Sequence, residues 1–246
     1  ALPICGRLGY AITPRFAPTS TPELLQAVQR LREEFPDTWL HTHLSENLNE
    51  IAWVKQLWPE HEHYLDVYHH YQLTGERSVF AHGIHLAEKE WRCLHETGSA
   101  IAFCPTSNLF LGSGLFRLPT SWQHQVRIGI GSDVGAGTSF SLLRTLGEAY
   151  KVAQLQSYRL RASEAFYHAT LGGAHALRLD DKIGNFQSGK EADLVVIDPA
   201  VTPLQRLRSA RCQDVYEQLF VLMTLGDERN ISETWVNGEQ VWCNEG

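Results

Sequence analysis

The sequence predicts an α/β protein that is built on a parallel sheet and followed by a smaller β-rich region. Short apolar runs alternate with segments of helical periodicity, which is the pattern of parallel strands joined by helices. The runs are continuously apolar, as expected for strands that are covered on both faces. We therefore expect one large domain over residues 1–182 and a small β-rich domain with a helix over residues 183–246.

Five apolar runs are expected to form the parallel strands, with helices between them. Thr21 stands before Pro22, and a threonine followed by a proline at the first helical position is a helix-start signal. Apolar residues then recur at helical spacing, as they do again in residues 51–58 and 86–97. The last of these segments stops at Gly98, a residue type that commonly ends helices. The five runs are residues 9–13, 38–44, 78–82, 100–104 and 126–131.

The pattern changes near residues 179–189, where we place the domain boundary. The dipeptide Asn237-Gly238 is typical of a two-residue type I′ hairpin turn, in which both positions need a positive φ angle. The elements expected in the C-terminal half are helices over residues 139–158 and 163–179, a strand over residues 192–198 and a hairpin over residues 232–242.

Composition excludes several classes of function. The formal net charge is −7 and basic residues do not cluster, which argues against nucleic acid and anionic membranes as partners. No apolar stretch approaches the ~18 residues of a membrane helix, and the N-terminal segment lacks the order of a signal peptide. Five dispersed cysteines without a CxxC pair indicate a reducing compartment, so we expect a cytoplasmic protein with a small-molecule ligand. These are Cys5, Cys93, Cys104, Cys212 and Cys243.

Three potential metal ligands follow three of the apolar runs. His43, His82 and Asp133 each stand at the C-terminal end of a run, the face on which (β/α)-barrel enzymes build active sites. Imidazole and carboxylate groups suit Zn²⁺, and also Fe²⁺. A metal held with one open position lowers the pKa of bound water toward ~7. Glu46, three residues after His43, is the expected proton carrier. A single histidine viewed alone is more often structural, but three strand ends in serial order favour a site.

Further polar residues follow the remaining runs. Arg15 follows the first run, and its fixed donor fork suits carbonyl oxygens and ring nitrogens of a ligand, although a salt bridge at a strand end would explain it too. Phe16 stands beside it and is expected to contact the ligand as well. Ser107 and Asn108 follow the fourth run and are expected either to line the pocket or to form a turn.

Other suggestive features are interpreted as structural. The histidine-rich stretch over residues 61–70 is expected to be a solvated helical face away from any strand end. His85 is assigned at most a supporting place near the site. The glycine-rich segments at residues 112–114 and 135–137 match no phosphate-binding loop, and a tight turn or close approach to a ligand explains both. The paired cysteines of the zinc deaminases that act on nucleic acid are absent.

The strand-end motifs resemble those of the amidohydrolase superfamily at its fifth, sixth and eighth barrel strands. The segments are residues 43–46 (HLSE), 81–83 (AHG) and 131–133 (GSD). Three further segments narrow the resemblance to the guanine deaminase branch: residues 14–19 (PRFAPT), 103–108 (FCPTSN) and 132–137 (SDVGAG). A fourth segment, residues 183–194 (IGNFQSGKEADL), is similar to the segment with which the chain of superfamily members returns to the small β domain.

The resemblance implies hydrolysis of guanine to xanthine and ammonia at one divalent metal, zinc more readily than iron. It makes His43, His82 and Asp133 the metal ligands, with Asp133 also accepting a proton from the attacking water. Glu46 would carry protons to the substrate, and Arg15 would bind the purine. We expect a homodimer. An aminohydrolase for another purine, a pterin or a triazine is the first alternative, and a non-catalytic remnant is the second.

One superfamily motif, the HxH of the first barrel strand, has no counterpart here. His41-Thr42-His43 has that form, but the residues that follow identify it with the fifth strand. The resemblance therefore implies strands four to eight of a (β/α)8 barrel with part of a small β-sandwich. On this basis we expect the chain to be part of a longer enzyme and to be inactive alone.

Overall fold

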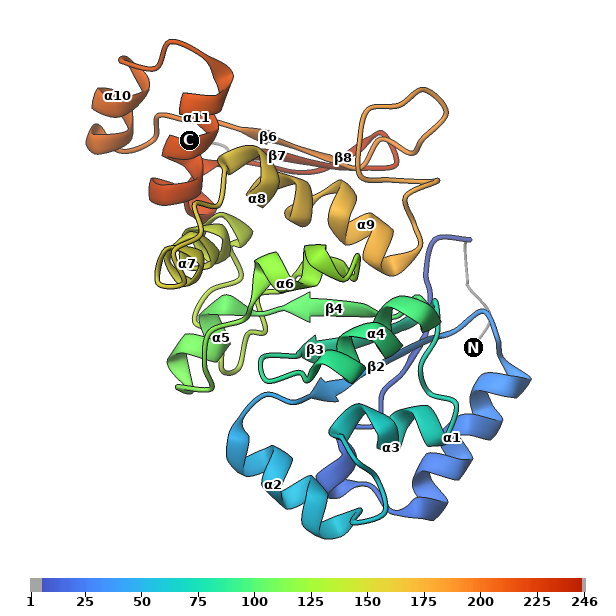
Figure 1. Cartoon of the computed structure of the whole chain (residues 1–246). Coiled ribbons are helices and arrows are strands. Elements are labelled where there is room, and N and C mark those ends of the chain that lie inside the picture. The colour runs from blue at the N-terminus through green and yellow to red at the C-terminus, as the bar shows by residue number, and fades with distance from the viewer. Residues whose placement is uncertain (1–5, 245–246) are drawn as a thin grey trace. The chain divides into compact units, whose positions relative to one another are not determined.

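The structure is a computed structural model that describes residues 6–244, so Cys5 lies outside the described residues. The chain divides into two compact units, and Figure 1 shows its course. The first unit comprises Ala1–Phe103 and Gly112–Ile128, and the second comprises Cys104–Leu111 and Gly129–Gly246. The sequence-based domain boundary after residue 182 stays a prediction.

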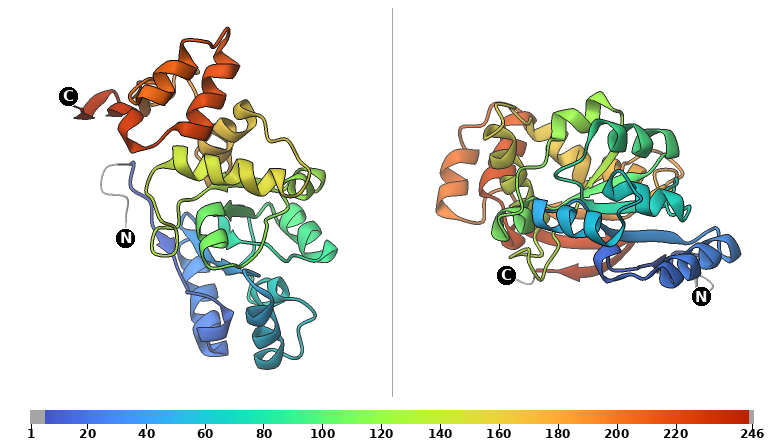
Figure 2. Two further views of the ribbon diagram at one scale, coloured as in Figure 1. Left: turned by 90° about the vertical axis from the view of Figure 1, so that its left-hand side faces the viewer. Right: turned by 60° about the horizontal axis from the view of Figure 1, so that its bottom comes forward.

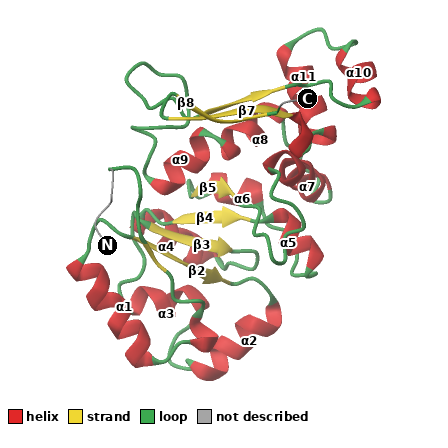
Figure 3. Cartoon of the chain, turned by 180° about the vertical axis from the view of Figure 1, so that it is seen from behind, coloured by secondary structure: helices red, strands yellow, loops and turns green. Residues whose placement is uncertain are grey.

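Five strands form one sheet, each within one of the five apolar runs in which a strand was predicted. They are joined in the order β1-β2-β3-β4-β5, and the pairs β1–β2, β2–β3 and β3–β4 are parallel. Figure 3 shows β2, β3 and β4 side by side in yellow. In β3 all five residues are buried, as the continuous apolar pattern predicts. The strands are β1 (Ala11–Ile12), β2 (Trp39–Leu44), β3 (Ser78–His82), β4 (Ala100–Phe103) and β5 (Arg127–Ile130), of which β5 begins in the first unit.

Helices of the first unit begin and end at the residues that the sequence marks. The Thr21 side chain accepts a hydrogen bond from the Leu24 amide, which satisfies one free N–H of the first turn. Gly98 ends the fourth helix with a φ of 68°, a left-handed conformation that glycine adopts without strain. The elements are η1 (Ala17–Thr19), α1 (Pro22–Glu34), α2 (Leu48–Leu57), α3 (Tyr64–His70), α4 (Glu88–Thr97) and α6 (Leu118–Gln123).

The histidine-rich stretch is not the solvated face that we predicted. Helix α3 buries four of its seven residues, and only the end of its polar side, with His69 and His70, is exposed. The interpretation was wrong because the apolar residues between the histidines fall on one face of a helical turn. The Tyr68 ring packs against the Phe80 ring of β3 with 5.5 Å between the ring centres, so this helix contributes to the core beside the sheet. The buried residues are Tyr64, Leu65, Val67 and Tyr68.

The second unit contains six α-helices within its described residues and a three-stranded antiparallel sheet of order β6-β7-β8. Helix α11 packs against α7 and α8, as both views in Figure 2 allow the reader to follow. The elements are α5 (Pro105–Phe110), α7 (Leu142–Gln154), α8 (Ala162–Ala169), α9 (Leu171–Leu177), β6 (Leu194–Ile197), α10 (Pro203–Ser209), α11 (Val215–Leu225), η2 (Glu228–Asn230), β7 (Ile231–Val236) and β8 (Glu239–Cys243).

One sequence prediction for the second unit needs correction, and one is confirmed. The helix predicted over residues 163–179 is two helices, α8 and α9, because Thr170 leaves helical geometry with φ −127° and ψ −102°. The small β-rich region, for which we expected a helix, contains the α-helices α10 and α11. The hairpin turn is confirmed, since Asn237 and Gly238 have φ angles of 52° and 81°.

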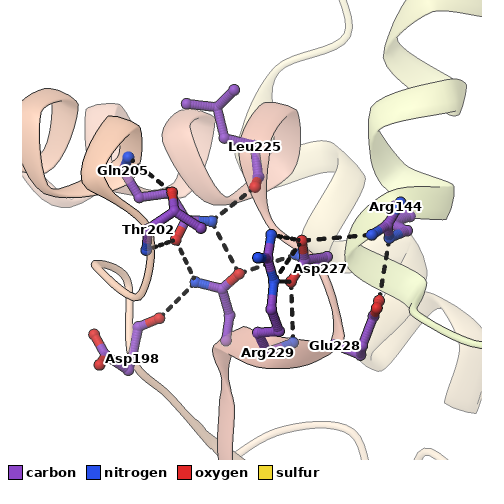
Figure 4. A network of polar contacts seen from close by, with 9 residues as sticks. Arg144, Asp198, Thr202, Gln205, Leu225, Asp227, Glu228 and Arg229 are labelled. Atoms are coloured by element: carbon purple, nitrogen blue, oxygen red, sulfur yellow. Dashed lines mark hydrogen bonds and ion pairs between the residues drawn. The ribbon is translucent and has the colours of Figure 1, made fainter.

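A buried polar network ties α10 to the end of α11 (Figure 4). Gln205 and Asn230 are both fully buried and bond to each other through both amide groups, at 3.0 Å and 3.2 Å. Gln205 also donates to the Leu225 carbonyl at 2.7 Å, and Asn230 donates to the Asp198 carbonyl at 2.7 Å. Each buried amide is therefore hydrogen-bonded, as burial of polar groups requires.

Asp227, beside this network, makes stability depend on pH. Its hydrogen bonds from Arg229 hold the pKa of the carboxyl below its ordinary value of 3.8. A depressed folded-state pKa stabilises the fold above the unfolded pKa, and this contribution is lost as the pH falls through the folded value. We expect Asp227→Asn to lower the free energy of unfolding by about 1–3 kcal/mol near pH 7, with a difference from wild type that shrinks below about pH 3.8.

Urea denaturation at a series of pH values measures this difference. Glu228→Gln is the matched control, because Glu228 is exposed and pairs with Arg144 at 3.1 Å on the surface, so a small change is expected. A gap between wild type and Asp227→Asn that stays constant down to pH 3 would contradict the assigned cause.

No helix in the described part of the chain is both long and apolar enough to span a membrane.

Candidate functional site

The C-terminal end of β2 presents His43 in one defined tautomer. The Arg15 carbonyl accepts hydrogen bonds from His43 Nδ1 at 2.7 Å, from the His43 amide at 3.2 Å and from Thr42 Oγ1 at 3.0 Å. A carbonyl can only accept, so Nδ1 carries the hydrogen and Nε2 of the neutral ring carries the lone pair. This is the arrangement that orients histidines which bind metals.

His82 lies beside His43, at the end of the neighbouring strand. The parallel register pairs Leu44 with His82, and the two imidazole rings stack at 5.3 Å with an interplanar angle of 21°. The His82 side chain is 1% exposed, and its Nε2 lies 3.7 Å from Glu46 Oε2. The structure therefore brings together two of the predicted ligands and the predicted proton carrier.

Backbone strain occurs at the same strand ends. Ser45 and His82 have positive φ angles of 48° and 74°, which side-chain-bearing residues rarely adopt. Such conformations cost of order 1–3 kcal/mol each and are typical of functional sites. The Ser45 carbonyl accepts hydrogen bonds from the amides of Ile84 and His85 at 3.1 Å and 3.2 Å, which holds both turns against each other.

A capping box at the start of α2 fixes the backbone of Glu46. Asn47 accepts a hydrogen bond from the Glu50 amide at 3.0 Å, and Glu50 in return accepts from the amides of Glu46 and Asn47. Tyr64 donates to the other Glu50 oxygen at 2.8 Å, and burial raises the pKa of Tyr64 far above its ordinary value. Glu50 was not expected from the sequence, although an asparagine followed three residues later by a glutamate is a capping-box signal.

Tyr68 is a second residue that the sequence analysis missed. Its hydroxyl donates to the His43 carbonyl at 2.9 Å and accepts a hydrogen bond from the Ala17 amide at 2.9 Å. Burial raises the pKa of Tyr68 to about 12, so the phenol stays protonated and can donate near neutral pH. Tyr68 thus joins the end of β2 to the loop that carries Arg15. The only signal for Tyr68 in the sequence is the helical spacing of the apolar residues within the histidine-rich stretch.

Arg15 and Phe16 lie on the loop after β1, next to His43. The Phe16 ring is 5.8 Å from the His43 ring and 6.4 Å from the Trp53 ring, which it meets edge-on. The Arg15 guanidinium carbon lies 5.2 Å from the centre of the Phe16 ring, and the residue is exposed. An exposed guanidinium beside an aromatic ring can bind a planar, carbonyl-bearing ligand.

In the second unit, Asp133 also has strained backbone, with a φ of 47°. Its carbonyl accepts a hydrogen bond from the Gly137 amide at 2.6 Å, and any side chain at Gly137 would collide with the Ser132 carbonyl oxygen. The glycine-rich segment after Asp133 therefore forms a tight turn, one of the two explanations that the sequence left open. The Cys104 sulfur lies within 4.8 Å of a carboxylate oxygen of Asp133.

Ser107 and Asn108 belong to helix α5 rather than to a turn, so the turn interpretation was wrong. Both are buried, at 0% and 1% exposure, and the Ser107 hydroxyl donates to the Cys104 carbonyl at 3.2 Å. The helix begins at Pro105, a residue type that suits the first helical position. Their assignment to substrate binding stays a prediction.

The donors that the first unit brings together fit a divalent metal. His43 offers Nε2 because Nδ1 is bound to a carbonyl, and the His82 ring is stacked on the His43 ring at the end of the neighbouring strand. Imidazole nitrogens are among the usual ligands of catalytic zinc sites.

Comparison with known proteins agrees with this chemistry. The chain is 64% identical to the guanine deaminase of Escherichia coli K12 over 96% of its own length and 54% of that protein. The solved E. coli guanine deaminase matches 98% of this chain and 56% of its own, with 63% identity and a TM-score of 0.97. The guanine deaminase of C. acetobutylicum, solved with guanine in its active site, is 32% identical over 94% of this chain and 55% of its own, with a TM-score of 0.85.

A more distant match is an adenosine deaminase from Xanthomonas campestris with bound zinc. It is 26% identical over 94% of this chain and 51% of its own, with a TM-score of 0.83. This chain thus spans about half the length of the curated relatives it matches. The model of the amidohydrolase family, whose members bind a metal, matches residues 5–241, and this protein belongs to that family.

Proposed function

We propose that this chain takes part in the hydrolytic deamination of guanine to xanthine and ammonia. The observation that carries the proposal is the cluster of His43, His82 and Glu46 at the carboxyl ends of two parallel strands. The two imidazole rings are stacked, and Glu46 Oε2 lies 3.7 Å from His82 Nε2. The high identity to a guanine deaminase over nearly the whole chain supports guanine as the substrate.

We propose that His43, His82 and Asp133 hold one divalent metal, with zinc favoured over iron. The defined tautomer of His43 and the donor types support this assignment, as does the zinc in the X. campestris relative. When bound, such a metal lowers the pKa of water toward ~7 and so supplies hydroxide at neutral pH. Asp133, on its strained turn after β5, is assigned the proton that the attacking water loses.

Glu46 carries protons to the substrate in this proposal. Its backbone is fixed by Glu50, and its Oε2 lies next to His82, where water and a purine nitrogen would meet. A carboxyl group placed in this way can protonate the ring nitrogen and then the departing ammonia. The reaction needs both transfers, because protonation of the ring nitrogen makes the C2 carbon electrophilic enough for attack by water, and protonation of the amino nitrogen lets it leave as ammonia.

Arg15 and Phe16 are proposed to hold the purine, and Ser107 and Asn108 are proposed as further substrate-binding residues. Phe16 offers an apolar ring beside His43, and the exposed fork of Arg15 can donate to the guanine carbonyl and a ring nitrogen. Such polar donors fix the orientation of a flat ligand between apolar groups.

At the level of fold, we propose that the five parallel strands belong to a (β/α)8 barrel of which they are the fourth to eighth. The antiparallel sheet β6-β7-β8 would be part of a small β-sandwich, with the boundary near residue 182. We expect the active protein to be a homodimer.

Turnover assays on the protein expressed from its natural gene test the proposed function. Guanine is expected to be deaminated faster than adenine, a pterin or an aminotriazine, with ammonia and xanthine released in equal amounts. Preference for one of the other heterocycles would favour the first alternative, an aminohydrolase of different specificity. No turnover of any of them by metal-loaded protein would favour a non-catalytic remnant.

Arg15→Ala is expected to raise KM for guanine about 10–100-fold with a smaller change in kcat. The side chain donates to the substrate in both ground state and transition state, and each such hydrogen bond contributes about 1–3 kcal/mol. Steady-state kinetics measure the change. Arg30→Ala on the exposed part of α1 is the matched control, for which wild-type kinetics are expected. A fall in kcat alone would show that Arg15 does not bind guanine.

A further inference from the structure

The glycine-rich segment Gly112-Ser113-Gly114 lies against the loop after β3. Gly112 and Gly114 have φ angles of 67° and 135°, which glycine alone adopts readily. A side chain at Gly114 would lie 3.0 Å from Ile84 and 3.1 Å from the His85 ring, so there is no room for one without a shift. Gly114 therefore lets the chain approach His85 closely, and Ser113 beside it is buried.

Ser113 makes two contacts that lead to the proposed proton carrier. Its hydroxyl donates to Glu46 Oε1 at 2.9 Å, and its carbonyl oxygen accepts a hydrogen bond from His85 Nε2 at 2.8 Å. Because a carbonyl only accepts, His85 carries its hydrogen on Nε2. Ser113 is 7% exposed, so water competes little for either contact.

The two oxygens of Glu46 are thereby distinguished. Oε1 accepts from Ser113, whereas Oε2 lies 3.7 Å from His82 Nε2. Without the serine, the carboxylate would be free to rotate about its last torsion, which is broad and has no strong preference of its own. The hydrogen bond therefore selects one orientation of the carboxylate.

We propose that Ser113 is a positioning residue for the deamination reaction, which fixes Glu46 so that Oε2 is the oxygen that carries the proton. This inference rests on the proposed function. His85 supports it by holding the main chain of Ser113, and Gly114 allows the close approach to His85. Ser113 does not touch the reacting atoms and acts only through Glu46.

The expected effect of Ser113→Ala is a 10–100-fold fall in kcat for guanine, with KM changed less than about threefold. General acid–base help is worth about 10²–10⁴-fold, and a displaced catalytic group loses part of that. Ser113→Thr keeps the hydroxyl and is expected to recover at least a third of wild-type kcat. Ser121→Ala is the matched control, because Ser121 is also fully buried and donates to a main-chain carbonyl, that of Leu118, at 2.7 Å.

A double-substitution cycle separates positioning from general destabilisation. In the background of Glu46→Gln, adding Ser113→Ala is expected to change kcat less than about twofold, because the group that Ser113 positions is already disabled. A fall as large as that in the wild-type background would overturn the proposal. So would a Ser113→Ala variant with wild-type kcat, or a Ser121→Ala control with the same loss.

A crystal structure of the Ser113→Ala variant tests the positioning without any assay of turnover. A Glu46 carboxylate that turns away from its wild-type orientation is expected, and an unchanged carboxylate would overturn the inference. If the wild-type protein does not deaminate guanine, the proposed function fails, and this structural result still decides whether Ser113 orients Glu46.

Discussion

Glu46→Gln is expected to lower kcat for guanine about 10²–10⁴-fold, the largest loss of any single substitution that keeps the site's shape. The amide is close to the carboxylate in size and can still contact Ser113 and the His82 region. It cannot accept and release a proton, so both proton transfers to the substrate lose their carrier. Stopped assays of xanthine formation under saturating guanine measure the change.

Metal content separates this effect from loss of the metal site. Glu46→Gln is expected to retain its metal at the wild-type ratio, since Glu46 is not among the proposed ligands. The exposed Glu96→Gln of α4 is the matched control and should keep wild-type kcat. Turnover within tenfold of wild type in Glu46→Gln would remove Glu46 from the mechanism.

His82→Ala is expected to weaken zinc binding by at least about 100-fold and to reduce guanine turnover to background. Loss of partners that only support a metal ligand already costs 10–100-fold in affinity, and here a ligand itself is removed. The substitution also leaves a cavity at a position that is 1% exposed. Zinc titration against a competing chelator measures the affinity.

His70→Ala is the control for this experiment. His70 lies exposed at the end of α3, within the histidine-rich stretch that carries no predicted ligand. Its replacement should leave zinc affinity within twofold of wild type. Equal losses in both variants would mean that zinc binds to histidines generally rather than at the strand ends, and would contradict the proposed site.

The strands and the neighbourhood of the site could be predicted because they depend on local pattern. Each parallel strand is one short apolar run, and the side chain after it falls at a common edge, which is why His43 and His82 were expected to meet. Helix ends at Thr21 and Gly98 and the turn at Asn237 follow from single residues with one strong conformational preference.

The supporting contacts could not be predicted because they join residues far apart in the chain. Ser113 and Glu46 are 67 positions apart, and no local pattern indicates that the two meet. Tyr68 was not expected at the site because it lies in a histidine-rich stretch, which we interpreted from its polar residues alone. The apolar residues of this stretch decide how the helix packs. Thr170 divides a segment whose composition reads as one continuous helix.

Position 15 combines two separable tasks, and this has a consequence for the evolution and engineering of substrate choice. The orientation of His43 depends on the main-chain carbonyl of Arg15, which every amino acid provides, whereas the proposed contact with the substrate is made by the Arg15 side chain. Variants in which only residue 15 is changed can therefore be screened for activity on new heterocycles, and the orientation of the His43 ring is expected to stay the same in all of them. Changes at Thr42 or Tyr68, by contrast, would disturb that geometry, so drift in specificity should concentrate on the loop after β1.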